Sequence, residues 1–308
     1  MEKELKINNI TDFINIIEQI KFTYELENPI QGMLLYRGIS NISYKMLPSI
    51  FRTFQNPIDD KYEHKKYVNE YEMYMHFIKE AKAFIKNLDD NTDIELLEWI
   101  VYAQHFGVPT RLLDFTGNPL VALYFACSDS KDTDGVVWIL NLKNYNYILA
   151  KLLGLRKKKT REDLILEILD YIQSVTKECP DYPVPFVPYY LDERMSAQAS
   201  NFLIWGNQEK PFEEMFTSEN YMNISFADKG QVLINYKGKS DEVLLKIIIC
   251  KEVKKKILSQ LDSFGINVKT IFPGLDGLGK YIENHYNCTD KMLIGEIPVT
   301  DYKEEQKK

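Results

Sequence analysis

Residues Tyr102–Asp129 read YAQHFGVPTRLLDFTGNPLVALYFACSD, and this stretch decides how the chain can fold. Its first part continues a helix that we predict from the capping box formed by Thr92 and Glu95, and Gly107 is well placed to end that helix. Pro119 suits the first turn of a second helix, PLVALYFAC, which is apolar on all sides and is therefore predicted to be buried. We expect the polar segment between the two helices, VPTRLLDFTGN, to be a loop.

The same stretch carries hydrogen-bonding side chains at high density between apolar segments. A structural loop does not need this chemistry, whereas a binding or catalytic site does. Each residue alone would more often be a satisfied structural residue, but their number within thirteen positions favours a site. The residues are Gln104, His105, Thr110, Arg111, Asp114 and Thr116.

Two further polar groups lie elsewhere in the chain. GMLLYRG is predicted to be a short buried strand ending at Arg37, whose planar guanidinium can grip phosphate or carboxylate in two places. Tyr36 precedes this arginine, and Gly38 after it would let a ligand approach the backbone closely. The alternative is a buried Arg37 paired with a carboxylate such as Asp114. The third group, in ERMSAQASNF before an apolar run, consists of Glu193, Arg194 and Gln198.

The composition is that of a soluble folded protein: 308 residues, 45% hydrophobic and 27% charged. Apolar runs of about 18 residues are absent, and the N-terminal MEKELKINNITDF lacks the apolar core of a secretory signal, so we expect a cytoplasmic protein without membrane contact. The four scattered cysteines predict free thiols rather than disulfides or zinc. A net charge of −7 argues against a large non-specific nucleic-acid footprint, although a local basic site remains compatible with it.

Signatures of several enzyme classes are absent from the sequence. It has no Gly-rich phosphate loop, no H-E-x-x-H and no G-x-S-x-G, and its four histidines are too dispersed for a metal cluster, so no metal is expected. Helices and short strands mix without a βαβ rhythm, which predicts an α+β fold with helices around a mostly antiparallel sheet. We expect a helical segment over 1–30, one compact domain over 31–300 with a proline-rich loop near 179–190, and a disordered tail over 301–308.

The polar groups, in this order, resemble the FRG domain family, named for a Phe/Tyr-Arg-Gly motif. Here the motif is LLYRG with LPSIFR following, and the long middle signature is QHFGVPTRLLDFTGNPLVALYFA. ERMSAQASNFLIWG and GINVKTIFPGLDGLGKYI resemble the later segments, so the resemblance runs from Leu34 to Ile282. After Gln198 the family tends to carry a small residue, often Gly, near the position of Ala199 and Ser200. The family is associated with bacterial and phage proteins, including predicted toxin and antiviral-defence systems.

A further similarity, in motif order, is to ADP-ribosyltransferases: an arginine on the first core strand, a Ser/Thr before a buried helix, and a Glu/Gln on a later strand. It implies catalytic roles for Arg37, Thr116, and Gln198 or Glu193, with NAD as substrate. Cleavage of the nicotinamide–ribose bond passes through a cationic state, which a carboxylate stabilises better than a neutral amide does. If Gln198 rather than Glu193 faces the site, transfer would be slow or the protein would only bind its ligand.

Three functional interpretations stay open at this point. The first is an ADP-ribosyltransferase-like effector that uses NAD or a related phosphorylated nucleotide and transfers ADP-ribose to a protein or nucleic-acid acceptor. The second is a nucleotide- or nucleic-acid-binding module without turnover, in which arginines grip phosphate and aromatic side chains stack on a base. The third, a hydrolase with His105 and Asp114 as acid–base pair, has less support. The buried helix from Pro119 and the Arg111 charge would together attract an anion.

Overall fold

The computed structural model describes residues 6–25, 34–55, 62–64, 70–84, 96–152, 159–174, 179–188, 192–215, 225–226, 232–233 and 243–286. The predicted capping box of Thr92 and Glu95 and the tail 301–308 lie outside these residues. The division of the chain at 30 and 300 therefore stays a prediction.

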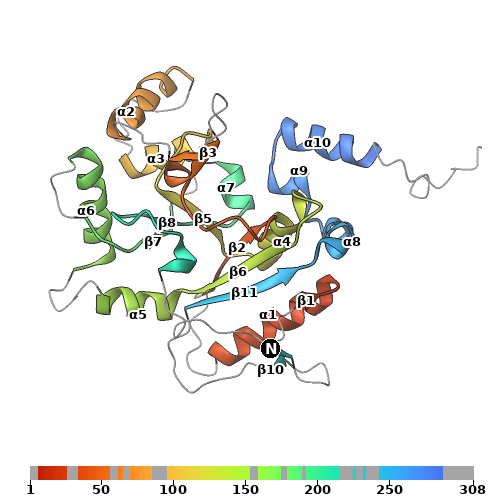
Figure 1. The fold of residues 1–308 in the computed structure, drawn as a ribbon. Helices are drawn as coiled ribbons and strands as arrows, with labels where there is room; N and C mark the ends of the chain where they lie inside the picture. The colour runs from red at the N-terminus through yellow and green to blue at the C-terminus, as the bar shows by residue number, and fades with distance from the viewer. Residues whose placement is uncertain are drawn as a thin grey trace, which may run out of the picture.

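A seven-stranded sheet forms the centre of the molecule (Figure 1). Neighbouring strands are antiparallel except at one edge, where β1 runs parallel to β11, so the predicted α+β fold with a mostly antiparallel sheet is confirmed. In spatial order the strands are β1 (Lys6–Ile7), β11 (Leu244–Ile249), β6 (Gly135–Asn141), β2 (Leu34–Ile39), β5 (Leu112–Thr116), β8 (Ser200–Ile204) and β7 (Val184–Phe186). Two short hairpins accompany it, formed by β3 (Thr53–Gln55) with β4 (Tyr62–His64) and by β9 (Ser225–Phe226) with β10 (Val232–Leu233).

Strand β5 corrects the sequence prediction, which assigned its residues to a loop. Leu112, Leu113 and Phe115 are all buried, and only Asp114 between them is exposed. Because both faces of this strand are covered, its sequence LLDFT does not show the alternation of apolar and polar residues that marks a half-buried strand. The polar residues within and around it made the segment look like a loop, although it lies near the middle of the sheet.

The two faces of the sheet support two hydrophobic cores. On β2, Leu35 and Ile39 enter one core while Tyr36 enters the other, as the alternating side-chain directions of a strand require. The core with Tyr36 is covered by α1 (Ile10–Glu25), α4 (Pro119–Ser128), α8 (Lys251–Ser263) and α9 (Val268–Ile271). The other core is covered by α2 (Glu70–Ala81), α3 (Leu96–His105), α5 (Leu142–Leu152), α6 (Arg161–Gln173) and the short turns η1 (Ser49–Phe51) and η3 (Phe212–Glu214). Figure 1 shows α1 and α2 on opposite sides of the strands.

Several helix boundaries follow from the predicted signals. Pro119 begins α4, and the Asn118 side chain caps it by accepting from the Leu120 amide at 2.9 Å. Gly107, with positive φ, follows the end of α3 as expected, and Gly265 follows the end of α8 in the same way. Helix α1 is capped by Asn9, whose side-chain oxygen accepts from the Asp12 amide at 2.9 Å.

The structure also bears on two expectations drawn from composition. Cys127 and Cys179 are free thiols, whereas Cys288 lies beyond the described residues. No helix in the described part of the chain is both long and apolar enough to span a bilayer.

Candidate functional site

The site forms where two neighbouring strands part. β2 pairs with β6 along its whole length, but its register with β5 holds only at Tyr36 opposite Thr116. Beyond this pair, Nη1 of Arg37 on β2 donates a hydrogen bond to the main-chain oxygen of Asp114 on β5. The Arg37 side chain therefore replaces the main-chain hydrogen bonds that β2 and β5 no longer form where they diverge. This bond also keeps the guanidinium at the opening between the two strands.

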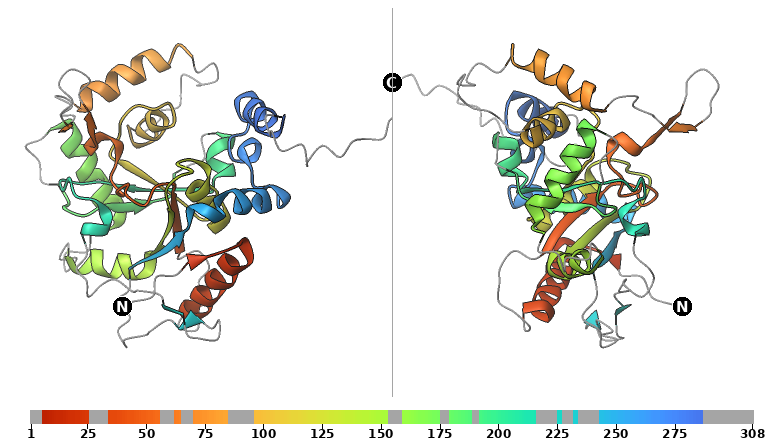
Figure 2. Two further views of the ribbon diagram at one scale, coloured as in Figure 1. Left: turned by 45° about the vertical axis from the view of Figure 1, so that its right-hand side comes forward. Right: turned by 90° about the vertical axis from the view of Figure 1, so that its left-hand side faces the viewer.

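A cavity of about 290 Å³ opens at this parting. Its walls come from β2, β5 and β8 and from α3, α4 and the short helix α7 (Glu193–Ala197). Helix α7 packs against α9 and β8, and the left view of Figure 2 shows it beside α9. The lining residues are Tyr36, Arg37, Gly38, Val101, Gln104, His105, Asp114, Phe115, Thr116, Phe125, Arg194, Met195, Gln198, Ser200 and Phe202. Nine of these fifteen were expected from the sequence, so residues from three distant segments share one cavity.

Arg37 is the most constrained charge in the cavity. Burial lowers the pKa of its guanidinium to about 10, with Asp114 acting in the opposite direction, and the group stays protonated at neutral pH. Only 17% of the side chain is exposed. Nε is buried and has no partner among the described residues, although a guanidinium has five N–H donors to satisfy. A guanidinium that stays charged and lines a cavity is suited to an anionic ligand.

Asp114 is the carboxylate nearest to Arg37, and it is held from the opposite direction by α3. One carboxylate oxygen accepts from Nε2 of Gln104 at 2.7 Å, and the other lies 3.8 Å from Nη1 of Arg37. The Gln104 side-chain oxygen in turn accepts from the Thr110 hydroxyl. Thr110 is fully buried and does not line the cavity, so it acts through Gln104 rather than on a ligand.

His105 pairs with Asp192. The acid–base interpretation required it to pair with Asp114, and the structure does not show that pair. Nε2 of His105 lies 3.2 Å from the Asp192 carboxylate, which joins the end of α3 to the cap of α7. Burial lowers the pKa of His105 below its usual 6.5, opposed by the Asp192 charge. The imidazole is therefore neutral at pH 7, and its 3.2 Å contact with Asp192 is a polar contact rather than an ion pair.

The α7 side of the cavity supplies a second cation and an amide. Arg194 lies over the ring of Phe272, with 4.7 Å between its guanidinium carbon and the ring centroid. Gln198 ends α7, and its amide nitrogen donates to the Ile271 carbonyl at 3.2 Å. Glu193 is exposed and does not line the cavity. Of the two residues considered for the acceptor position, Gln198 is the one at the cavity.

Thr116 lines the cavity, but its hydroxyl already has two main-chain partners. It donates to the Gln198 carbonyl at 2.6 Å and accepts from the Asn118 amide at 3.0 Å. These bonds tie the end of β5 to the end of α7 and to the cap of α4. Thr116 therefore joins three walls of the cavity, and a ligand has little of its hydroxyl left to use.

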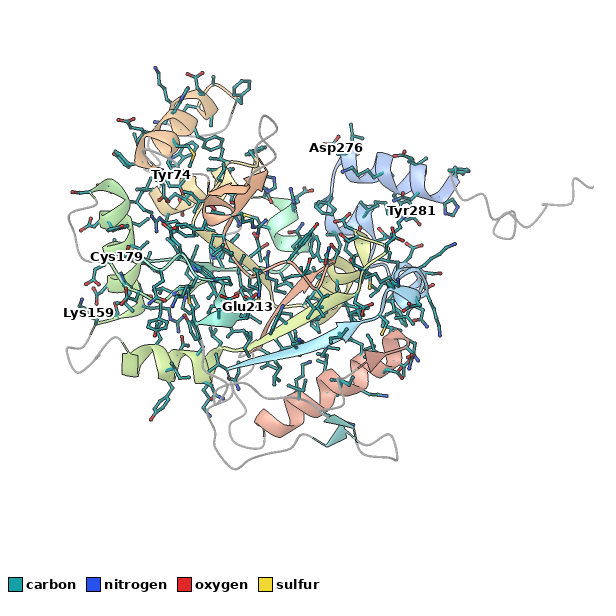
Figure 3. All side chains as sticks on the ribbon, viewed as in Figure 1. Tyr74, Lys159, Cys179, Glu213, Asp276 and Tyr281 are labelled. Carbon is teal, nitrogen blue, oxygen red and sulfur yellow. The ribbon has the colours of Figure 1, made fainter. Side chains whose placement is uncertain are left out.

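Arg111 is the clear departure from the expected site. Its Nε donates to Glu70 at 2.6 Å and its Nη1 to the Gly206 carbonyl at 2.6 Å, while Phe51 and Tyr171 cover the guanidinium. Glu70 also accepts from Tyr74, which Figure 3 labels on α2. Arg111 is buried and lines no part of the cavity, so it does not belong to the candidate site. Its ion pair with Glu70 links α2 to the start of β5.

Gly38 has a structural reason that the sequence did not reveal. A Cβ on Gly38 would lie 1.8 Å from the Ala122 carbonyl oxygen, so the glycine allows α4 to pack directly on β2. Its neighbour Tyr36 is 2% exposed, and its buried hydroxyl has no partner among the described residues. Burial, reinforced by the Glu18 charge, raises the pKa of this phenol far above its usual value.

Sequence reasoning missed most of the apolar part of the lining. These side chains look like core residues, and only their position beside Arg37 gives them contact with a ligand. They are Val101, Phe125, Met195 and Phe202, joined by the small polar Ser200. The described residues also bring Asp134, Cys250 and Glu252 within reach of one ion, but one Asp134 oxygen already accepts from the Lys251 amide and none of the three lines the cavity.

Comparison with known families bears on residues 32–135, which match the family model of the FRG domain. Residues 32–135 are an FRG domain. The matched span contains the Arg37 strand, β5 and α4, and thus most of the cavity wall around Arg37. Arg194 and Gln198 complete the cavity from outside that span. A search of the curated proteins found no match, and a search of the solved structures found none either.

Proposed function

We propose that the FRG domain binds a phosphorylated nucleotide, NAD or a related molecule, in the cavity around Arg37. The observation that carries the proposal is the Arg37 guanidinium, which is charged, lines the cavity and has one donor atom, Nε, without a partner in the described chain. A phosphate oxygen fits such a group better than a neutral acceptor does, because charge-assisted hydrogen bonds are about twice as strong as neutral ones.

The remaining lining suits the other parts of a nucleotide. Arg194 adds a second positive charge, against a single lining carboxylate, Asp114, among the described residues. Phe125, Phe202 and Met195 offer the apolar and aromatic surface on which a base or a nicotinamide ring packs. At about 290 Å³ the cavity lies near the lower end of ligand pockets, a size suited to one nucleotide half more than to a whole dinucleotide.

Calorimetric titration with NAD, ADP-ribose and AMP tests the binding. We expect binding by the wild type, loss of at least about tenfold in affinity for Arg37→Ala, and only partial recovery for Arg37→Lys, because lysine restores the charge but not the fork. Arg161→Ala is the matched control, since Arg161 is exposed on α6. Equal binding by Arg37→Ala and the wild type would remove the proposal, as would the absence of binding to all three compounds.

ADP-ribosyl transfer is the second candidate, and the shared lining of Arg37, Thr116 and Gln198 favours it. These are the three positions of the transferase-like order, and such an activity would fit a toxin or antiviral-defence effector. Gln198 makes the reaction slow, because a neutral amide stabilises the cationic transition state less than a carboxylate would. Nicotinamide release from NAD, compared with the Arg37→Ala variant, tests this candidate with protein and nucleic-acid acceptors present.

Binding of single-stranded nucleic acid is the form of the proposal with less support, because the chain carries a net charge of −7. Its signature would be salt-dependent binding of RNA or DNA that persists in Gln198→Ala. The acceptor and the cytoplasmic site of action remain expectations from the sequence.

A further inference from the structure

We infer that Gln104 is a positioning residue that keeps the Asp114 carboxylate off the Arg37 guanidinium, so that Arg37 stays available to a phosphate. The inference rests on the proposed binding of a phosphorylated nucleotide at Arg37. The sequence led us to expect that Gln104 contacts the ligand. In this inference Gln104 instead holds the Asp114 carboxylate away from the Arg37 guanidinium.

The distances around Asp114 set up this inference. Its side chain is 60% exposed, so it has room to turn. A carboxylate beside an arginine ordinarily forms two parallel N–H···O bonds with it at 2.7–2.9 Å. Here the nearer carboxylate oxygen stays 3.8 Å from Nη1 of Arg37, while the other is bonded to Gln104 at 2.7 Å. Arg37 instead donates to the Asp114 main-chain oxygen.

Gln104 is fixed in this orientation from both ends. Its side-chain oxygen accepts from the Thr110 hydroxyl, and that hydroxyl accepts from the Leu112 amide at 3.2 Å. The Thr110 amide donates to the Ser49 hydroxyl at 3.1 Å, which holds the threonine in place. Because a carboxylate only accepts, the nitrogen end of the Gln104 amide has to face Asp114. The chain from Ser49 through Thr110 to Gln104 therefore holds Asp114 from the side of the interior.

Removal of Gln104 releases the carboxylate toward its nearest cation. Asp114 would then turn onto Arg37 and occupy the donors that the proposed ligand uses. A phosphate would have to displace a carboxylate that is tethered next to the guanidinium, and its affinity would fall. Removal of the Asp114 charge as well should abolish this competition, which makes the pair testable as a double-mutant cycle.

The first experiment measures binding of ADP-ribose to the wild type, Gln104→Ala, Asp114→Asn and the double variant. We expect about tenfold weaker binding for Gln104→Ala, and a return to within about twofold of Asp114→Asn for the double variant. Wild-type affinity in Gln104→Ala would overturn the inference. A double variant as weak as Gln104→Ala would also overturn it, because Gln104 would then contact the ligand itself. Thermal unfolding of all four proteins checks that they are folded.

The second experiment needs no ligand, and so separates failure of this inference from failure of the proposed function. The chain has six arginines, and the Nε–Hε NMR signal of Arg37 is assigned by its loss in Arg37→Lys. We expect Gln104→Ala to shift this signal as the carboxylate reaches the guanidinium, and the double variant to keep it near the position in Asp114→Asn. An unmoved signal in Gln104→Ala would overturn the inference even if the wild type binds nucleotides. If the wild type binds none, the proposed function falls while this signal still decides the role of Gln104.

Discussion

Arg37 donates to the main-chain oxygen of Asp114 at the point where β2 and β5 stop pairing. This contact holds Arg37 in the same cavity as Asp114 and Thr116, which lie about eighty residues further along the FRG match. It also fixes the guanidinium while leaving Nε unpaired in the described structure. Arg37 is therefore held in place and still has a hydrogen-bond donor without a partner in the described structure, as expected of a ligand-binding group.

Replacement of Arg111 should cost stability and leave ligand binding intact. Its pair with Glu70 has both side chains only 11% exposed, and breaking a buried pair from one side costs about 3–5 kcal/mol. We therefore expect Arg111→Met to lower the free energy of unfolding by about that amount in urea denaturation. The exposed Arg161→Met should change it by less than about 0.5 kcal/mol. A stable Arg111→Met protein that no longer binds nucleotide would return Arg111 to the site.

Substitution of Gly38 should disrupt the packing of α4 on the sheet. The Cβ of alanine would lie 1.8 Å from the Ala122 carbonyl oxygen, so a helix backbone would have to move. We expect Gly38→Ala to destabilise the protein by about 3 kcal/mol or more, measured by thermal unfolding. Gly117→Ala is the matched control, because its Cβ would meet nothing closer than 3.8 Å. Similar melting temperatures for the two variants would contradict the close approach.

The burial of His105 predicts a pH dependence of stability. Burial sets the pKa of folded His105 below 6.5, so the unfolded chain takes up the proton first as the pH falls. The histidine therefore costs the folded state stability from about pH 6.5 downward, through its folded pKa. His105→Gln should lose less stability than the wild type between pH 7 and 5, by about 1 kcal/mol or less. If the free energy of unfolding changes equally with pH in both proteins across this range, the lowered pKa of His105 is refuted.

A carboxylate at position 198 should accelerate nicotinamide release. Gln198 lines the cavity, and glutamate would add a negative charge beside the cation that forms on the ribose. We expect Gln198→Glu to release nicotinamide from NAD at least about tenfold faster than the wild type, a barrier change of about 1.4 kcal/mol. Glu193→Gln, altered at an exposed residue outside the cavity, should leave the rate unchanged. If Gln198→Glu is no faster while Glu193→Gln is slower, the two residues have been assigned the wrong way round.

Much of the architecture followed from local signals. The start of α4 at Pro119, the glycines after α3 and α8, and the strand ending near Arg37 could be predicted because caps, φ preferences and apolar runs act over a few residues. β5 could not be predicted, because a strand covered on both faces shows no alternation and its polar neighbours resemble a loop.

The candidate site shows the same division. Polar density and motif order selected Arg37, Gln104, Asp114 and Gln198 as members of one site, and all four line the cavity. The same reasoning also selected Arg111 and Glu193, which do not. An arginine beside a polar cluster looks the same in sequence whether it faces a cavity or an ion-pair partner such as Glu70.

The sequence by itself determined the residue types of the site, the FRG motif and the α+β class, because these depend on side-chain chemistry and short-range periodicity. The tertiary structure alone decided which arginine meets the cavity, which of Gln198 and Glu193 faces it, and why residue 38 is glycine. Those outcomes depend on strand register and helix packing between segments far apart in the chain, where a shift of one residue turns a side chain to the opposite face.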